Sequence, residues 1–262
     1  MRLSSVSALA IAVAIPLALS ACQSSDTTPT AEAPVSEATV ERAVGAAALD
    51  TERLLAADSE PGSWLTTGQN YWEERYSRLD EINTSNVANL GLAWSADIDT
   101  ERGQESTPVV IDGVMYLTTA WSMVKAYDIA TGEELWAYDP EIDRAKGADA
   151  CCDVVNRGVA AWNGKIYVGL LDGRLVALDG KTGSVVWETQ TTDTSLPYTI
   201  TGVPRIVKGK VVIGNGGAEY RVRGYATAYD AETGEQVWRW YSIPGNPADG
   251  FEQPELEEVV DT

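Results

Sequence analysis

Two neighbouring cysteines, Cys151 and Cys152, carry the most distinctive chemistry of this 262-residue sequence. The Cα atoms of adjacent residues lie about 3.8 Å apart, which is shorter than the usual span of a disulfide. A bond between them would close a strained ring, which is tolerable only in an oxidising compartment and usually marks a functional site. The alternative is a pair of buried thiols that are adjacent by chance. At this point both interpretations stay open.

The complete absence of histidine excludes several kinds of catalytic site. Ser-His-Asp and Cys-His catalysis, histidine general bases and histidine-ligated zinc all require this residue. The chain has 39 acidic and 19 basic residues, for a formal net charge of −20. Binding to nucleic acid needs a basic face, so we expect no nucleic-acid partner.

A glycine-rich segment, Gly214–Glu219, is the one long departure from a regular pattern of strands and turns. The distance from Gly209 to Ala228 is 19 positions, whereas the matching distance from Gly164 to Ala177 is 13. Glycines allow backbone N–H groups to approach the oxygens of a ligand closely. The segment therefore favours a ligand-binding loop, and the alternative is a flexible hairpin with an exposed glutamate.

The elements that would position these residues repeat along the chain. The pattern Ala-x-Asp-x-x-Thr-Gly-x-x-x-Trp occurs at 126–136, 177–187 and 228–238, at intervals of 51 residues. Each copy predicts a strand, a turn and a second strand, because Asp opens such turns and Gly supplies their left-handed position. A second hairpin is predicted before each copy, with turns at Asp112-Gly113, Asn163-Gly164 and Lys208-Gly209.

Two hairpins in each repeat give four strands, which predicts an all-β fold, a β-propeller built from four-stranded blades. Trp94 is expected to end a preceding blade, and three more blades end at Trp136, Trp187 and Trp238. A propeller needs about four to eight blades to close. Residues 251–262 are acidic and offer no closing strand. We therefore expect an incomplete propeller of three to four blades, the N-terminal part of something longer.

Residues 1–21 are predicted to form a signal peptide of the lipoprotein type. An apolar run from about Val6 to Leu19 follows Arg2 and is shorter than a membrane-spanning helix. Leu19 fits an ordinary cleavage site badly, whereas Leu19-Ser20-Ala21-Cys22 resembles the bacterial lipobox, in which the cysteine carries lipid. Gln23 follows the cysteine, and lipoproteins without an aspartate at this position are usually sent to the outer membrane of Gram-negative bacteria. The alternative is a plain secretory peptide with an incidental cysteine.

The remaining chain divides into three predicted parts. Residues 22–37 are rich in Ser, Thr, Ala and Pro and predict a flexible tether. Residues 38–61 predict a helix or linker, because Val40, Val44, Leu49 and Leu54 lie loosely at helical spacing. Residues 62–262 form the partial propeller.

The repeated pattern resembles the tryptophan-docking motif of the quinoprotein dehydrogenases, eight-bladed propellers that hold pyrroloquinoline quinone (PQQ). The resemblance runs from about Gly62 to Thr262 and is strongest to the soluble PQQ-dependent alcohol dehydrogenases. Similar blades also build non-catalytic propellers, among them an outer-membrane assembly scaffold lipoprotein. A scaffold of that kind is the alternative function.

The resemblance implies a set of cofactor-binding residues. In the family a disulfide between neighbouring cysteines, here Cys151 and Cys152, stacks on one face of PQQ. Arg157 matches the cation that binds the quinone oxygens, and its alternative role is a surface ion pair. Glu105 matches a hydrogen-bonding position, and its alternative is a solvated carboxylate. The remaining positions implied to contact PQQ are Thr201, Gly216, Gly217 and Ala218.

Metal, substrate and partner also follow from the resemblance. Glu219 matches a calcium ligand, and the implied reaction is oxidation of a small alcohol with PQQ and Ca²⁺, with electrons passing to a cytochrome c. The catalytic Asp of the family would lie beyond Thr262, so this chain is expected to be inactive alone. The expected location is the periplasm, with membrane contact only through the lipid anchor.

Overall fold

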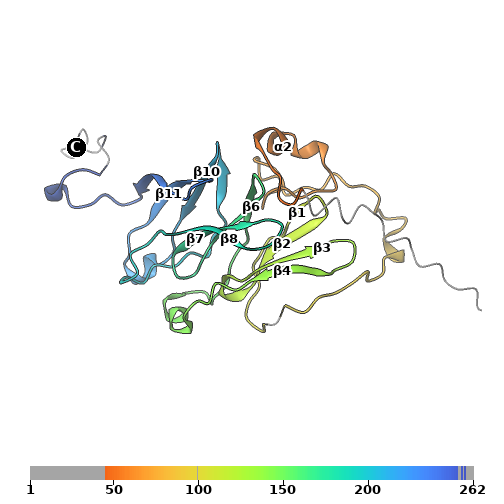
Figure 1. Ribbon diagram of the computed structural model, residues 1–262, viewed down its shortest axis with the longest axis horizontal. Helices are drawn as coiled ribbons and strands as arrows, with labels where there is room; N and C mark the ends of the chain where they lie inside the picture. Colours follow the sequence, from red (N-terminus) through yellow and green to blue (C-terminus); the bar gives the residue numbers. More distant parts are fainter. Residues whose placement is uncertain (1–44, 99, 253–254, 256, 258–262) are drawn as a thin grey trace, which may run out of the picture. The chain divides into compact units, whose positions relative to one another are not determined.

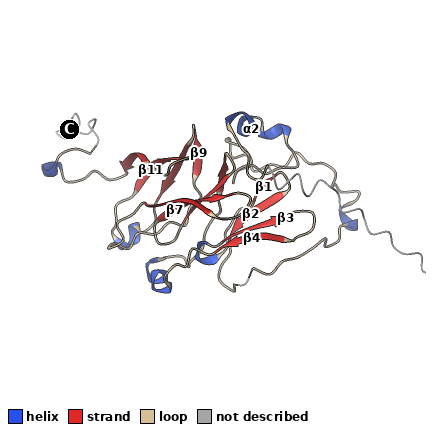
Figure 2. Ribbon diagram, in the orientation of Figure 1, coloured by secondary structure: helices blue, strands red, loops and turns tan. Residues whose placement is uncertain are grey.

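The computed structural model describes residues 45–98, 100–252, 255 and 257. Its strands form three four-stranded antiparallel sheets, each in sequence order (Figures 1 and 2). The first contains β1 (Val109–Ile111), β2 (Val114–Thr118), β3 (Val124–Asp128) and β4 (Glu134–Tyr138). The second contains β5 (Ala160–Trp162), β6 (Lys165–Gly169), β7 (Arg174–Asp179) and β8 (Val185–Gln190). The third contains β9 (Arg205–Val207), β10 (Lys210–Gly214), β11 (Tyr225–Asp230) and β12 (Gln236–Tyr241). The predicted blades of two hairpins each are confirmed.

The turn that joins the last two strands of each blade is built by one aspartate. Asp128 Oδ1 accepts hydrogen bonds from the backbone N–H of Ala130 and Thr131, both 2.9 Å long. Asp179 and Asp230 do the same in the second and third blades. The glycine that follows the threonine has a positive φ of 71° to 76° in all three copies. The repeated Asp and Gly are therefore explained by the turn itself.

The repeated tryptophan joins each blade to the next. Trp136 Nε1 donates to the Gly180 carbonyl at 3.1 Å, and Trp187 Nε1 donates to the Ala231 carbonyl at 3.0 Å. Trp94 makes the equivalent bond to Ile129 at 3.0 Å. Trp94 thus docks as predicted for the end of a preceding blade, although no strand of the described residues pairs with its own segment.

Burial follows the order of the strands. The third strands, β3, β7 and β11, are largely buried, whereas the fourth strands, β4, β8 and β12, are mostly exposed. Apolar side chains form three core clusters among the described residues: one around β2 and β6, one around β10, and a small one of Tyr198, Val222 and Tyr225. The blades therefore pack through their inner strands and leave the outer strands to solvent.

The helix of the predicted 38–61 segment is much shorter than expected in its described part. It is α2 (Thr51–Leu55), with the Asp50 side chain capping its N-terminus. Residues before it are not helical, because their carbonyls accept hydrogen bonds from the second blade: Asn163 N–H donates to Leu49 and Gly164 N–H to Ala47. Pairing with the blade has overridden the weak helical pattern.

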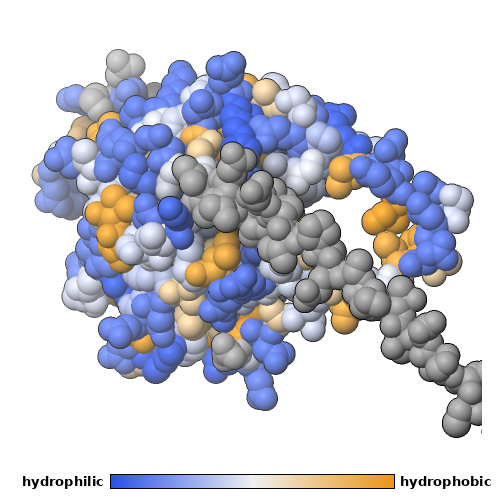
Figure 3. Space-filling view, turned by 45° about the vertical axis from the view of Figure 1, so that its right-hand side comes forward, coloured by the Kyte–Doolittle hydropathy of each residue, from blue (hydrophilic) through white to orange (hydrophobic). Residues whose placement is uncertain are grey.

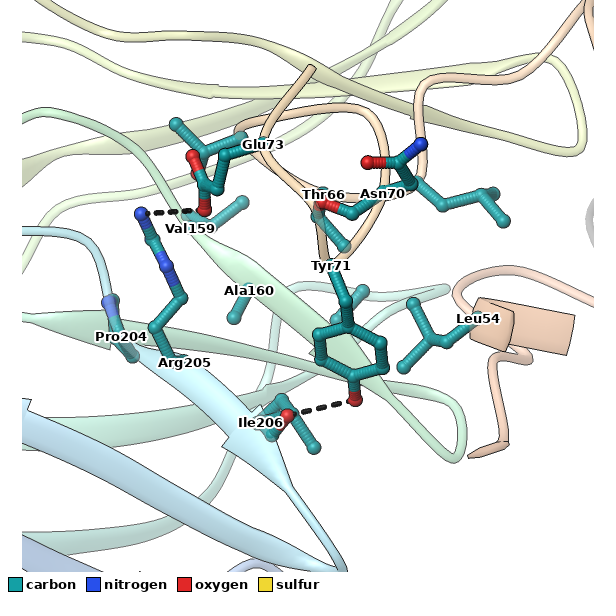
Figure 4. Close-up of a pocket in the computed structure, with 13 residues that line it drawn as sticks. Leu54, Thr66, Asn70, Tyr71, Glu73, Val159, Ala160, Pro204, Arg205 and Ile206 are labelled. Atoms are coloured by element: carbon teal, nitrogen blue, oxygen red, sulfur yellow. Dashed lines mark hydrogen bonds and ion pairs between the residues drawn. The ribbon is translucent and has the colours of Figure 1, made fainter. Parts of the chain in front are cut away.

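A small apolar cavity of about 30 Å³ lies where this N-terminal segment covers β5 and β9 (Figure 4). The Tyr71 hydroxyl crosses it to the Ile206 carbonyl at 2.9 Å, and Arg205 pairs with Glu73 at 3.1 Å. About 30 Å³ leaves room for one water molecule. This cavity is a packing feature, far too small for a cofactor.

The predicted signal peptide, Cys22 and the tether of residues 22–37 lie outside the described residues. Within the described part, no helix is long and apolar enough to cross a membrane. The face seen in Figure 3 is mostly hydrophilic, in keeping with the net charge of −20, and its apolar residues gather in separate patches.

Candidate functional site

Most of the predicted site residues line one cavity of about 150 Å³. Seven of the nine are there: Cys151, Cys152, Arg157, Thr201, Gly216, Gly217 and Glu219. They come from three separate connections, which follow β4, β8 and β10. Residues that are up to 68 positions apart in the chain (151 to 219) therefore meet at one place.

Backbone hydrogen bonds hold the three connections together. The Arg157 N–H donates to the Thr201 carbonyl at 3.0 Å, and the Gly216 N–H donates to the Thr199 carbonyl at 2.7 Å. The segment 199–201 thus lies between the other two and is tied to both. These backbone hydrogen bonds hold the three connections next to one another around the cavity.

Arg157 is the central cation of the site. One guanidinium nitrogen donates to the Thr201 hydroxyl at 2.5 Å, and another pairs with Glu105 Oε2 at 2.7 Å. The Arg157 side chain is still 43% exposed, so the guanidinium remains accessible. Glu105 does not line the cavity and reaches the site only through this ion pair. The ion pair that the sequence analysis gave as the alternative for Arg157 is thus present, and its cofactor-binding role stays a prediction.

Both cysteines are exposed free thiols in the structure. The predicted disulfide is therefore not present, and it stays a prediction; the alternative of two buried thiols is wrong. The pKa of the Cys151 thiol is raised to about 12, because hydrogen bonds with Cys152 and then with the Glu219 carboxylate favour the protonated form. Cys151, Cys152 and Glu219 all line the same cavity.

The glycine-rich segment forms a tight loop that ends in the short 3₁₀ turn η5 (Ala218–Tyr220). Gly217 has a φ of +109°, and a Cβ there would lie 2.6 Å from the Pro197 carbonyl oxygen, so only glycine fits. Ala218 lies between two lining residues without lining the cavity itself. The pKa of Glu219 is lowered by its own backbone N–H and by the Cys151 thiol.

Four lining residues escaped the sequence analysis: Ala150, Asp153, Val155 and Thr199. Thr199 was detectable, because residues two apart in an extended segment face the same side and Thr201 was already predicted. Asp153 accepts hydrogen bonds from the Arg102 guanidinium, which lowers the pKa of its carboxyl group. It ties the cysteine segment to residues 102–105.

The donor set suits a flat ligand with several oxyanions. Arg157 and Thr201 offer N–H and O–H donors, and a second hollow of about 280 Å³ shares Arg157, Thr201 and Gly216 with the first. The residues present therefore fit one side of a PQQ site. No group of three or more His, Cys, Asp or Glu side chains among the described residues could hold a metal ion, so calcium stays an expectation.

Comparisons with known proteins match most of this chain. The family model described as "PQQ: Glucose/ethanol/alcohol dehydrogenase, beta-propeller domain" matches residues 64–260. Quinohemoprotein alcohol dehydrogenase ADH IIB of Pseudomonas putida is 55% identical over 217 residues, which are 83% of this chain and 31% of that protein. The 1-butanol dehydrogenase (cytochrome c) of Thauera butanivorans is 54% identical over 77% of this chain and 29% of its own length.

A solved structure extends the match to three dimensions. The crystal structure of quinohemoprotein alcohol dehydrogenase from Comamonas testosteroni superposes with a TM-score of 0.81 at 52% identity. The match covers 87% of this chain and 34% of that chain. The chain thus spans about a third of the length of the relatives that it matches.

Proposed function

Since the chain belongs to the PQQ glucose/ethanol/alcohol dehydrogenase β-propeller family, we propose that it supplies one side of the cofactor site of a quinoprotein alcohol dehydrogenase. The substrate class is a small primary or secondary alcohol, and the electron acceptor is a cytochrome c. The names of the relatives support this proposal, since they include quinohemoprotein alcohol dehydrogenases and a 1-butanol dehydrogenase (cytochrome c).

One observation carries the proposal: three connections bring Cys151, Cys152, Arg157, Thr201 and Glu219 to one cavity. A scaffold propeller, the alternative function, binds proteins through its loops and has no reason to gather these side chains. The convergence therefore favours a dehydrogenase over a scaffold.

Each residue of the site has a role that follows from its chemistry. The Arg157 guanidinium and the Thr201 hydroxyl bind and orient oxyanions of the cofactor at one edge of the cavity. The two cysteines form a flat, polarisable wall that excludes water from one face of a bound ring. When bound, PQQ supplies the two-electron chemistry of alcohol oxidation. Glu219 contributes a carboxylate on the same side, suited to a hard cation such as Ca²⁺.

The disulfide belongs to the same proposal. Cys151 and Cys152 are adjacent exposed thiols, so a disulfide-exchange partner of the exported protein can reach them, and closing the strained ring requires the local backbone to adjust. In mass spectrometry, the peptide that contains both cysteines should be lighter by two hydrogen atoms than its reduced form. Treatment with a reductant should remove this difference. Two thiols in protein recovered from the periplasm under air would contradict it.

Binding of PQQ to the purified chain tests the cofactor assignment. Arg157→Gln removes the guanidinium and should weaken binding about tenfold, the effect of losing a charge-assisted hydrogen bond at a half-exposed site. Equilibrium dialysis with PQQ and Ca²⁺ measures the affinity.

Arg205→Gln is the matched control. Arg205 is 44% exposed against 43% for Arg157, and it also pairs with one glutamate, but it lies at the small cavity of Figure 4. Its removal should leave PQQ binding unchanged. Equal losses in the two variants would mean that Arg157 attracts PQQ only through its charge.

We also propose that the chain is exported and anchored to the outer membrane through lipid on Cys22. The lipobox-like Leu19-Ser20-Ala21-Cys22 supports this location. Cys22→Ala should move the protein from the membrane fraction to the soluble periplasm, and globomycin should block processing of the original sequence. Membrane retention of Cys22→Ala would overturn the anchor.

A further inference from the structure

Arg157 lies in a tight turn that is closed by the side chain of the residue before it. Asn156 is only 2% exposed, whereas the Arg157 side chain is 43% exposed. The Asn156 Oδ1 accepts a hydrogen bond from the Gly158 N–H at 3.0 Å. A bond from an N–H to the asparagine side chain two residues earlier closes an Asx turn, and Arg157 is the middle residue of this turn.

The amide nitrogen of Asn156 ties the turn to two blades. Its Nδ2 donates to the Gly169 carbonyl at 2.8 Å and to the Ser122 hydroxyl at 3.2 Å. Gly169 ends β6 of the second blade, and Ser122 lies between β2 and β3 of the first. Because the Gly158 N–H needs an acceptor and the Gly169 carbonyl needs a donor, only one orientation of the carboxamide satisfies both.

The Ser122 hydroxyl is a fixed point for this carboxamide. Ser122 is fully buried and has a φ of +58°, and its hydroxyl also accepts a hydrogen bond from the Leu171 N–H at 3.1 Å. A residue other than glycine keeps such a φ only where the surrounding structure holds it firmly. The turn around Arg157 is therefore attached to parts of both blades that are themselves rigid.

We propose that Asn156 is a positioning residue of the cofactor cavity, which holds the Arg157 turn so that the guanidinium meets the oxyanions of PQQ. The inference rests on the proposed function, in which Arg157 binds these oxyanions. Asn156 lines neither of the two hollows that Arg157 lines, so it acts through Arg157 and not on the ligand itself. A binding group has to be held within about 0.5 Å of its productive position, and hydrogen bonds from the residues behind it do this.

Equilibrium dialysis of the purified chain with PQQ and Ca²⁺ tests the positioning. Asn156→Ala removes the acceptor of the turn and both donors to the blades, and should weaken PQQ binding about fivefold, the effect of one lost hydrogen bond on the site. Asn70→Ala is the matched control. Asn70 is 5% exposed, accepts from the Trp72 N–H two residues later at 3.0 Å, and donates to two carboxylates, but it lines the small cavity of Figure 4. Its removal should leave PQQ binding unchanged.

A double-mutant cycle separates positioning from a general loss of structure. Arg157→Gln alone should weaken binding about tenfold. Adding Asn156→Ala to Arg157→Gln should cause no further loss, because Asn156 affects the ligand only through the guanidinium. Two independent losses, which would multiply to about fiftyfold in the double variant, would overturn the positioning role.

Hydrogen exchange of backbone amides, followed by NMR, tests the same role without PQQ. The Arg157 N–H donates to the Thr201 carbonyl at 3.0 Å, and Asn156→Ala leaves this acceptor in place. Exchange of the Arg157 N–H should nevertheless become about tenfold faster, because the turn that holds it opens more often. Asn70→Ala should not change this rate. An unchanged rate in Asn156→Ala would refute the proposal.

A second variant covers the case in which Asn156→Ala does not fold, as judged by circular dichroism. Ser122→Gly removes one acceptor of the Asn156 amide, and glycine suits the positive φ at this position. It should also accelerate exchange of the Arg157 N–H, and no acceleration would count against the tether. Failure of the original chain to bind PQQ would overturn the proposed function, and with it the cofactor role of Asn156. The exchange rate would still decide whether Asn156 holds the turn.

Discussion

Charged side chains around the candidate PQQ cavity are held in pairs. Arg157 pairs with Glu105, and the Arg102 guanidinium donates to Asp153. Glu219 has no cation but accepts the Cys151 thiol hydrogen. Pairing limits how far each side chain moves, so the cavity is prepared for a ligand before one arrives. It also means that each carboxylate of the cavity is already occupied.

The raised pKa of Cys151 predicts that its thiol reacts slowly with alkylating reagents. In reduced protein at pH 8, a pKa of about 12 keeps the thiol protonated, so alkylation by iodoacetamide should be more than about tenfold slower than for an ordinary cysteine. The rate should rise only as the pH approaches that pKa. Glu219→Gln removes one of the two interactions that favour the protonated thiol, and should lower the pKa and accelerate alkylation.

Mass spectrometry of the peptide that contains Cys151 measures this rate across pH. Glu232→Gln is the control, because Glu232 also has a lowered pKa but pairs with Lys165 in another part of the chain. A Cys151 rate that is the same with and without Glu219 would show that the carboxylate does not hold the thiol.

The blade contact depends on a glycine that faces a tryptophan ring. Gly183 has a φ of +71°, and a Cβ there would lie 2.6 Å from the Trp136 ring. Gly132 and Gly234 face Trp94 and Trp187 in the same way. Each of these glycines therefore serves twice, once for the left-handed turn and once for the close approach of the next ring.

Two glycine variants separate these roles. Gly209→Ala, at φ +70° with nothing within 4 Å of the added Cβ, should cost about 1 kcal/mol of unfolding free energy from the backbone alone. Gly183→Ala adds a clash with Trp136 and should cost about 1–3 kcal/mol more.

Urea unfolding of both variants measures the difference. Trp136 fluorescence should change only in Gly183→Ala, because only that substitution displaces the ring. Equal losses of stability would mean that the tryptophan contact tolerates a methyl group and that the turn conformation alone selects glycine.

At the scale of the whole molecule, the described blades expose large apolar side chains of the kind that pack between neighbouring blades. Trp238, the third repeat tryptophan, is 42% exposed, whereas Trp136 is 9% exposed beneath the second blade. Large apolar side chains are also exposed along residues 71–92, including Trp72 and Leu92 at 84% each. The relatives are about three times as long as the matched part of this chain.

We expect the purified chain alone to give no dye reduction with PQQ, Ca²⁺ and ethanol. The described residues build one side of the cavity, and its carboxylates, Asp153 and Glu219, are engaged by Arg102 and Cys151. A general base must be free to accept the hydroxyl proton. Fusion to the remaining part of a relative's chain should restore turnover. Turnover by the chain alone would mean that one of these carboxylates serves as the base.

The sequence by itself determined the blades, because Asp, Thr-Gly and Trp each act within a turn or a single hairpin and recur every 51 residues. Through the resemblance carried by residues 151–157 and 214–219, it also named most of the predicted residues that line one cavity. Tertiary structure decided the rest. In the described part of the predicted 38–61 segment, pairing with the second blade limited the helix to Thr51–Leu55, and Glu105 reached the site through Arg157. The candidate cavity needed three connections to meet, because residues 151, 201 and 219 are distant in the chain and backbone hydrogen bonds between the connections bring them together.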